Sequence, residues 1–308
     1  MMKALHWLAG RAAWLLFAGV TTGLFVPALA ALAWPLVLPI TFLLLVVSVV
    51  RMDMGAVLGH LRRPLQPLLA VGAQLVAAPL IVALVVGALP LPPALALALI
   101  LTATTTPLLS SPAFCLLMGL EGELALVVLV GALIAAPFTM PPLTLSLLGL
   151  EIALSPVEFM GRLLLFVGAG FALAAILRRW AGQERLAAHA RALDGFNVVL
   201  LVLFSVGVMN GVAEKFLAEP AYVGLFIATA FAFNLAQQAL GAVLFLPAGR
   251  RAALTAGFLF GYRNMPLPLV VMGAAAPADF ALYVAVAQLP MYMLPAVMQP
   301  AYRRLLRR

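Results

Sequence analysis

Charged residues are scarce in this 308-residue chain: 9% of its residues are Asp, Glu, Lys or Arg, whereas 66% are hydrophobic. A soluble domain is roughly 25% charged and about half apolar, because polar side chains must cover its surface. Two smaller domains would each still need a polar exterior. The composition therefore excludes a soluble enzyme and indicates an all-α polytopic membrane protein whose main partner is the lipid bilayer.

Cysteine and histidine are almost absent. The single cysteine, Cys115, excludes an internal disulfide and a cysteine-rich metal site. His6, His60 and His189 lie in charged or terminal stretches, so the sequence predicts no metal cluster and no cofactor. There is also no Walker motif, no GxGxxG and no nucleophile–base pair, which argues against an enzyme or an ATPase.

Ten apolar stretches are long enough to cross a bilayer as helices, which takes about 20 residues. The expected spans are residues 13–30, 34–50, 67–89, 93–118, 124–148, 159–177, 195–212, 221–246, 252–275 and 280–302.

The basic residues orient these spans. With both termini in the cytoplasm, fifteen of the 18 Lys and Arg residues fall in cytoplasmic segments, and Arg162 and Lys215 fall on the other side. The net charge of +8 thus reflects topology and implies no nucleic-acid partner. The expected location is a bacterial inner membrane, and no obligate protein partner is evident. As an alternative, the first span resembles a signal peptide, whose cleavage would leave nine spans.

The ten spans form two halves, residues 1–150 and 151–308. Five spans in each half require the second to be inverted relative to the first, as in secondary transporters with broken helices at the membrane midplane. Residues 102–112 in the fourth span and 261–268 in the ninth are such interruptions, rich in Pro and polar residues. We predict a substrate site there, with Thr104, Thr105, Thr106, Ser110, Ser111 and Asn264 as candidates. The alternative is a pair of proline kinks whose Ser and Thr hydroxyls bond to backbone carbonyls.

Amide side chains lie within two further spans. Gln74 is in the third, and Asn234, Gln237 and Gln238 are in the eighth. Buried amides in a membrane need partners, and backbone freed at the breaks would supply them. Gln74, Asn234 and Gln238 are therefore candidate binding residues as well as candidate links between helices.

Arg263 is the one charge expected at membrane depth, because all ten Asp and Glu residues map to span ends or connections. Such a charge costs several kcal/mol unless it is paired or hydrated. The guanidinium either caps carbonyls of its own broken helix or holds an anionic substrate by a bidentate contact. The absence of an intramembrane carboxylate argues against proton or sodium coupling through such a group.

The order of these features resembles the bile acid:sodium symporter family. The similar features are Asp53 and Arg62-Arg63-Pro64 after span two, Gln74 and Pro79, the broken span four, Gly122-Glu123, Pro137 and Pro141, Asn234, and the run Gly261-Tyr262-Arg263-Asn264. The resemblance implies a core domain of spans three to five and eight to ten, and a panel domain of spans one, two, six and seven. It further implies alternating-access transport of organic anions, with substrate bound where the broken helices cross.

The departures from that family concern its sodium ligands. Leu259 and Arg263 stand where the family has a glutamate and a glutamine, and the span-four ligands are replaced by a Thr/Pro/Leu/Ser-rich stretch. We therefore predict a transporter of a small organic anion with weakened or absent sodium coupling and no metal site. Alternatives are an auxin-efflux-type or arsenite-efflux-type carrier of the same fold, the latter using Cys115, and a membrane sensor or assembly partner that no longer transports.

Overall fold

The computed structural model describes residues 2–9, 11–52, 55, 59, 65–148 and 154–307. These residues are α-helical apart from short turns and one isolated β-bridge, and they contain no sheet. Seven helical stretches are long and apolar enough to cross a membrane, and Trp14–Phe25, Pro93–Ala103 and Pro266–Ala275 are shorter apolar helices. The long stretches are Pro27–Arg51, Leu65–Gly87, Gly122–Leu148, Pro156–Ala181, Ala190–Ala218, Pro220–Leu244 and Ala278–Leu306. The chain is thus an integral membrane protein.

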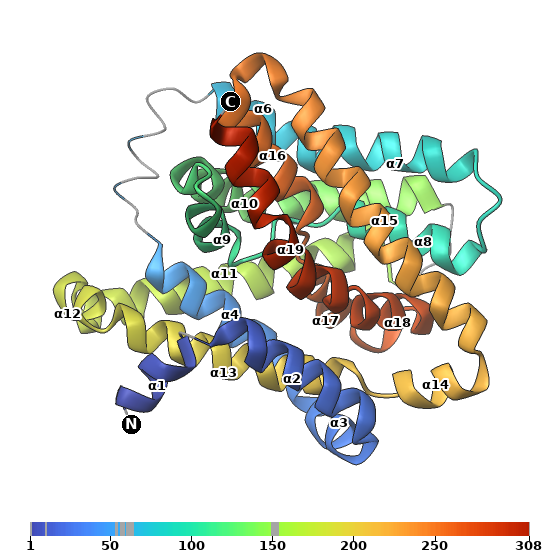
Figure 1. Cartoon of the computed structure of the whole chain (residues 1–308), viewed down its shortest axis with the longest axis horizontal. Coiled ribbons are helices and arrows are strands. Elements are labelled where there is room, and N and C mark those ends of the chain that lie inside the picture. The colour runs from blue at the N-terminus through green and yellow to red at the C-terminus, as the bar shows by residue number, and fades with distance from the viewer. Residues whose placement is uncertain are drawn as a thin grey trace.

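The helices pack in two groups, which lie in the lower and upper parts of Figure 1. Group A contains α1 (Met2–Ala9), α2 (Ala12–Phe25), α3 (Pro27–Ala33), α4 (Val37–Arg51), α11 (Pro156–Ala181), α12 (Gln183–Ala188) and α13 (Ala190–Val208). After α13, the short helix α14 (Val212–Ala218) leads to the second group.

Group B contains the remaining helices. They are α6 (Leu65–Gly72), α7 (Ala78–Gly87), α8 (Pro93–Ala103), α9 (Ser111–Met118), α10 (Gly122–Leu148), α15 (Pro220–Leu244), α16 (Arg250–Gly261), α17 (Pro266–Met272), α18 (Ala278–Val286) and α19 (Gln288–Arg307). A π-helical turn, Ala73–Ala77, joins α6 to α7.

Both predicted interruptions are present. Residues 93–118 form α8 and α9 with a non-helical stretch between them, and residues 252–275 are divided between α16 and α17. The predicted first span differs, because α2 ends at Phe25 and the chain turns at Val26. The physical reason is Pro27, which lacks the N–H that would continue α2 and instead starts α3. Most of the connection between the second and third predicted spans lies outside the described residues, as do Asp53, Arg62, Arg63 and Pro64.

Small residues set the spacing between α2 and α13. A Cβ added at Gly23 would lie 2.6 Å from the Val206 carbonyl oxygen and 2.8 Å from the Met209 Cβ. In a membrane, where the hydrophobic effect does not drive helices together, such close backbone approach maximises dispersion contacts.

Replacing Gly23 with alanine is expected to destabilise the protein by about 1–3 kcal/mol, because the new methyl group forces α2 away from α13. The measurement is the unfolding midpoint in detergent. Gly168→Ala on α11 is the matched control, because a Cβ there meets nothing within 4 Å. Equal midpoints for the two variants would contradict the packing described.

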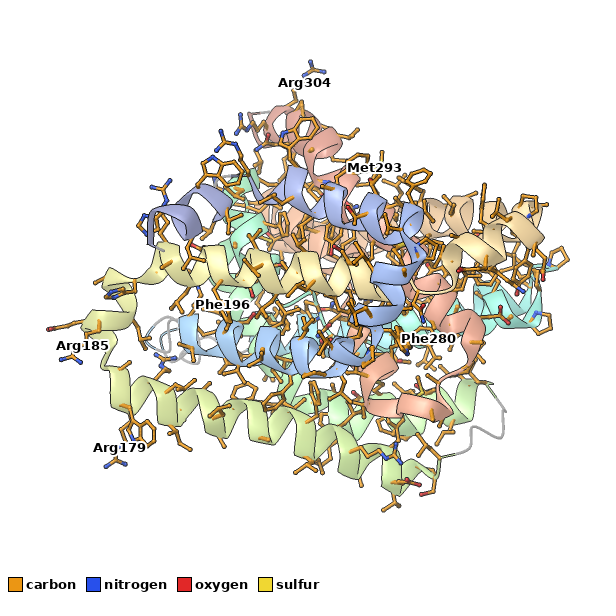
Figure 2. The ribbon with its side chains drawn as sticks, turned by 90° about the horizontal axis from the view of Figure 1, so that it is seen from below. Arg179, Arg185, Phe196, Phe280, Met293 and Arg304 are labelled. Atoms are coloured by element: carbon orange, nitrogen blue, oxygen red, sulfur yellow. The ribbon has the colours of Figure 1, made fainter. Side chains whose placement is uncertain are left out.

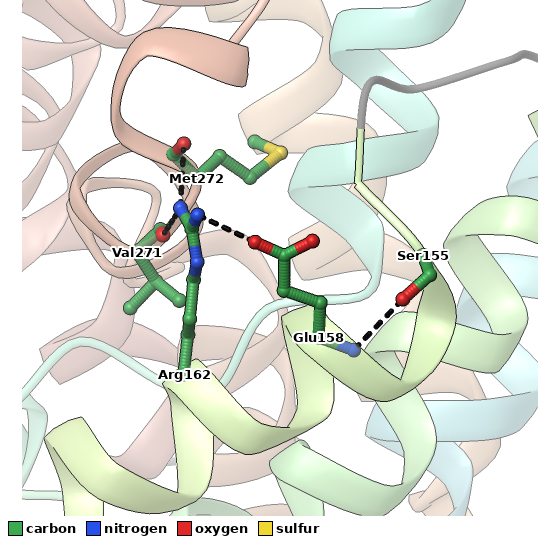
Figure 3. Close-up of polar contacts among 5 residues, drawn as sticks. All are labelled: Ser155, Glu158, Arg162, Val271 and Met272. Carbon is green, nitrogen blue, oxygen red and sulfur yellow. Dashed lines mark hydrogen bonds and ion pairs between the residues drawn. The ribbon is translucent and has the colours of Figure 1, made fainter.

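An arginine connects the two groups at one end of the molecule (Figure 3). Arg162 of α11 donates to the Glu158 Oε1 at 2.7 Å and to the carbonyls of Val271 and Met272 at 3.4 Å each. These carbonyls belong to the last turn of α17, and the last carbonyls of an α-helix lack N–H donors from a following α-helical turn. Arg179, Arg185 and Arg304 point outward from the body in Figure 2.

Candidate functional site

The two helix breaks follow from their prolines. Pro107 and Pro112 flank the end of the first break, and Pro266 and Pro268 follow the second. The missing N–H groups prevent α8 and α16 from continuing. The threonines at the end of α8 bond back to its carbonyls, Thr104 Oγ1 to Leu101 O at 2.8 Å and Thr105 Oγ1 to Thr102 O at 2.7 Å. The hydroxyls thus satisfy backbone acceptors, as the proline-kink alternative requires, although each helix is fully interrupted rather than bent.

The breaks cross and bond to each other. The Leu108 N–H donates to the Tyr262 carbonyl, and the Asn264 N–H donates to the Thr106 carbonyl, both at 2.8 Å. These two bonds make an antiparallel bridge between Pro107 and Arg263. Unpaired backbone would be costly at this depth, and each break therefore supplies the partners that the other lacks.

A third segment presents a free carbonyl to the crossing. In the π-helical turn, the Ala78 N–H bonds to the Ala73 carbonyl, five residues earlier. By the same pattern the Gln74 carbonyl would accept from residue 79, but that residue is Pro79 and has no N–H. The Gln74 carbonyl is therefore available to another donor, while the Gln74 side chain reaches across and its Nε2 donates to the Leu259 carbonyl at 2.9 Å.

Arg263 joins all three segments. Its Nε donates to the Phe260 carbonyl at 2.7 Å, and its Nη1 donates to the Thr105 carbonyl at 2.9 Å and the Gln74 carbonyl at 3.1 Å. The side chain is 1% exposed. The three ion pairs among the described residues are Arg51–Asp194, Glu158–Arg162 and Lys215–Glu219, so no described carboxylate neutralises Arg263. The result is a buried cation held by backbone carbonyls, with its net charge uncompensated.

A chain of side-chain bonds stabilises the other side of the second break. Asn234 Nδ2 donates to the Gly261 carbonyl at 2.8 Å, Gln238 Nε2 donates to the Asn234 Oδ1 at 2.6 Å, and the Tyr302 hydroxyl donates to the Gln238 Oε1 at 2.6 Å. These contacts tie α15 and α19 to the last residue of α16. Asn234 and Gln238 therefore link helices, as the sequence suggested for one of their two roles.

A cavity of about 1100 Å³ lies between groups A and B and reaches the crossing; we call it the crossing cavity. Its walls include Thr41, Ser48 and Arg51 of α4, residues 108–110 and Asn264 of the two breaks, Pro112 and Phe114 of α9, Glu123 of α10, Arg191, Asp194 and Asn197 of α13, and Gln288 and Tyr292 of α19. The Asn264 side chain makes no hydrogen bond within the described part of the chain, although it is 4% exposed. Its amide is free to bind a solute in the cavity.

The predicted site residues fall into two sets. Ser110 and Asn264 line the crossing cavity. The others are buried around the crossing, outside the cavity wall, and bond chiefly to backbone or to each other; they are Arg263, Gln74, Thr104, Thr105, Thr106, Ser111, Asn234 and Gln238. The crossing thus brings together the third, fourth, eighth and ninth predicted spans. Most of the predicted residues lie behind the cavity wall and hold the crossing together.

Gln288 and Asn197 are polar cavity residues that the sequence reasoning did not single out. Gln288 is 1% exposed, and its Nε2 donates to the Val284 carbonyl at 2.8 Å. The signal for both was available, since each is an amide inside an apolar stretch. What the sequence lacks is the packing that makes them face the same space as Asn264.

Arg263 engages backbone oxygens of the crossing that could otherwise bind a cation. Sodium would need oxygen ligands, yet the Gln74 and Thr105 carbonyls already accept from a guanidinium that carries the positive charge itself. No group of three or more His, Cys, Asp or Glu side chains suited to a metal ion occurs among the described residues.

Comparison with known proteins gives no match, either to a protein-family model or to a curated protein.

Proposed function

We propose that the protein is a secondary transporter that moves a small organic anion across the membrane by alternating access. The observation that carries the proposal is the uncompensated Arg263 charge behind the crossing cavity. Broken helices at the midplane and a bonded crossing between them are the features by which transporters place a polar site inside a membrane. We propose no enzymatic activity for this protein.

The electrostatics of the cavity favour an anion. Arg263 precedes Asn264, which lines the cavity, so a fixed positive charge lies directly behind the wall. Ser110 and Pro112 place the start of α9 at the same wall, and helix N-termini carry partial positive charge. Asn264 and Gln288 add amide donors. The substrate need not contact the guanidinium to be attracted by it, since charges act over longer range at low dielectric.

The proposed architecture is ten membrane helices in two inverted halves, with the three shorter apolar helices completing the first, fourth and ninth spans. Group A corresponds to the panel domain and group B to the core domain of bile acid:sodium symporter-like proteins. Arg51 and Arg191 are exposed and line the crossing cavity together with Asp194, so with both termini cytoplasmic this cavity opens toward the cytoplasm of a bacterial cell.

Sodium coupling is replaced in this proposal by a permanent charge. A carrier whose cation is covalently part of the protein gains nothing from a sodium gradient, so transport is facilitative or coupled in another way. The arsenite-efflux alternative is disfavoured by Cys115, which is fully buried and lies outside the cavity wall. An auxin-efflux-type substrate would still be an organic anion and fits the same site.

The experiment is uptake into proteoliposomes of labelled small carboxylates, with labelled amines of matched size as the comparison. We expect saturable uptake of at least one carboxylate, at least about fivefold above protein-free liposomes, and none of the amines. Thermal stabilisation by a carboxylate without any flux would instead indicate the sensor alternative, and amine uptake would contradict the assigned charge preference.

A further inference from the structure

A second cavity lies at the other end of the interface between the helix groups. This distal cavity has a volume of about 740 Å³ and is lined by Trp34, by parts of α17 and α18, and by Val208, Asn210, Gly211, Val212 and Lys215. It shares no lining residue with the crossing cavity. The molecule therefore has one hollow at each end of the same interface, with packed side chains between them.

Each cavity has one carboxylate on its group B wall. Glu123 lines the crossing cavity from the first turn of α10, and Asp279 lines the distal cavity from the first turn of α18. Helix α10 is the fifth predicted span and α18 begins the tenth, so the two carboxylates occupy corresponding positions in the two proposed halves. Neither belongs to an ion pair within the described residues.

Each carboxylate shares its cavity with a cation from another helix. Arg191 at the start of α13 lines the crossing cavity, is exposed, and forms no ion pair with a described residue. Lys215 of α14, the helix between the two groups, lines the distal cavity; its ion-pair partner among the described residues is Glu219, and its ammonium lies over the Tyr222 ring of α15. Arg51 also lines the crossing cavity but is already paired with Asp194 on the same wall. Each cavity thus holds a carboxylate and a cation that belong to different helices.

We propose that Glu123 with Arg191, and Asp279 with Lys215, are two alternating gate pairs. Closing either cavity brings the two helices of its pair together and lets the carboxylate bond to the cation, while the other cavity is open and its pair is apart. This inference rests on the proposed transport function, because it assigns the pairs to its two access states. A carboxylate in a first helical turn also interacts favourably with the helix dipole, and the experiment separates that role from gating.

The experiment measures labelling of a cysteine in each cavity by a bulky water-soluble maleimide, with the full chain in lipid nanodiscs. The reporters are Ser48→Cys for the crossing cavity and Ala274→Cys for the distal cavity. Buried Cys115 provides the background rate in the chain without a reporter. Removing Glu123 with Glu123→Gln is expected to raise Ser48→Cys labelling at least about threefold and to lower Ala274→Cys labelling, whereas Asp279→Asn does the reverse.

Matched variants make each outcome decisive. Glu214→Gln removes a carboxylate of α14 that lines neither cavity and is expected to leave both rates unchanged. Arg191→Gln is expected to repeat the effect of Glu123→Gln from the other wall, and the exchange Arg191→Glu with Glu123→Arg is expected to restore the parent rates. Three results would contradict the gate proposal. They are labelling rates like those of Glu214→Gln in every variant, a change of both labelling rates in the same direction, and an exchange variant that does not restore the parent rates.

Labelling requires no substrate, so the experiment tests the gate pairs independently of the transport function. A chain whose two cavities open in opposition but that carries no solute contradicts the proposed function and leaves the gate pairs intact.

Discussion

Replacing Arg263 with glutamine is expected to abolish anion uptake and to lower the thermal stability of the protein. The guanidinium donates to three carbonyls in three separate segments, Phe260, Thr105 and Gln74. A buried acceptor left without a donor costs roughly 1–3 kcal/mol. Losing the three bonds together is therefore a large fraction of the stability of a typical folded protein, about 5–15 kcal/mol.

The charge of Arg263 has a separate effect on uptake. A unit charge about 8 Å from an anion, in an effective dielectric of about 20, contributes about 2 kcal/mol, or roughly thirtyfold in affinity. Lysine keeps this charge but replaces the planar fork with one ammonium on a shorter side chain, which cannot reach three carbonyls in the same geometry. Arg263→Lys is thus expected to lose stability yet retain measurable uptake, whereas Arg263→Gln loses both.

The measurement combines melting temperature in detergent with uptake per folded molecule in proteoliposomes. Arg304→Gln serves as the control, because Arg304 is exposed and its side chain points away from the body. Equal uptake by the lysine and glutamine variants would show that Arg263 acts only as a structural clamp. Unchanged melting temperatures in both variants would contradict the claim that Arg263 stabilises the three segments.

Much of this site was predictable because the membrane leaves few choices for polar groups. Prolines placed both breaks within one or two residues of where the helices end, and hydropathy alone placed Arg263 at depth without a carboxylate. The amides of Gln74 and Asn234 were expected to seek backbone freed at the breaks, and they bond to the carbonyls of Leu259 and Gly261.

The remainder depended on three-dimensional packing. That Arg263 lies behind the cavity and Asn264 lines it follows from the crossing of two segments about 150 residues apart in sequence. The free Gln74 carbonyl depends on a π-helical turn, which only the combination of Pro79 with the observed helix geometry explains. Likewise, nothing in a single chain shows that Glu123 and Arg191 share one cavity.

Exchanging sodium for potassium is expected to change anion uptake by less than about twofold. The physical reason is that the carbonyls of Gln74 and Thr105, which a cation would otherwise need, are occupied by Arg263. Leu259, whose backbone carbonyl accepts from the Gln74 side chain, offers no carboxylate there. A guanidinium does not dissociate during transport, so no ion gradient is consumed at this position.

The direct measurement is initial-rate uptake of the best labelled carboxylate into proteoliposomes under an inward sodium gradient, and under an equal potassium gradient with sodium absent. Membrane potential is held at zero in both, and protein-free liposomes give the background. Equal rates in the two ions are the result that a fixed Arg263 charge predicts. Uptake at least about tenfold faster with sodium would show that a dissociable cation still couples to transport, and would contradict it.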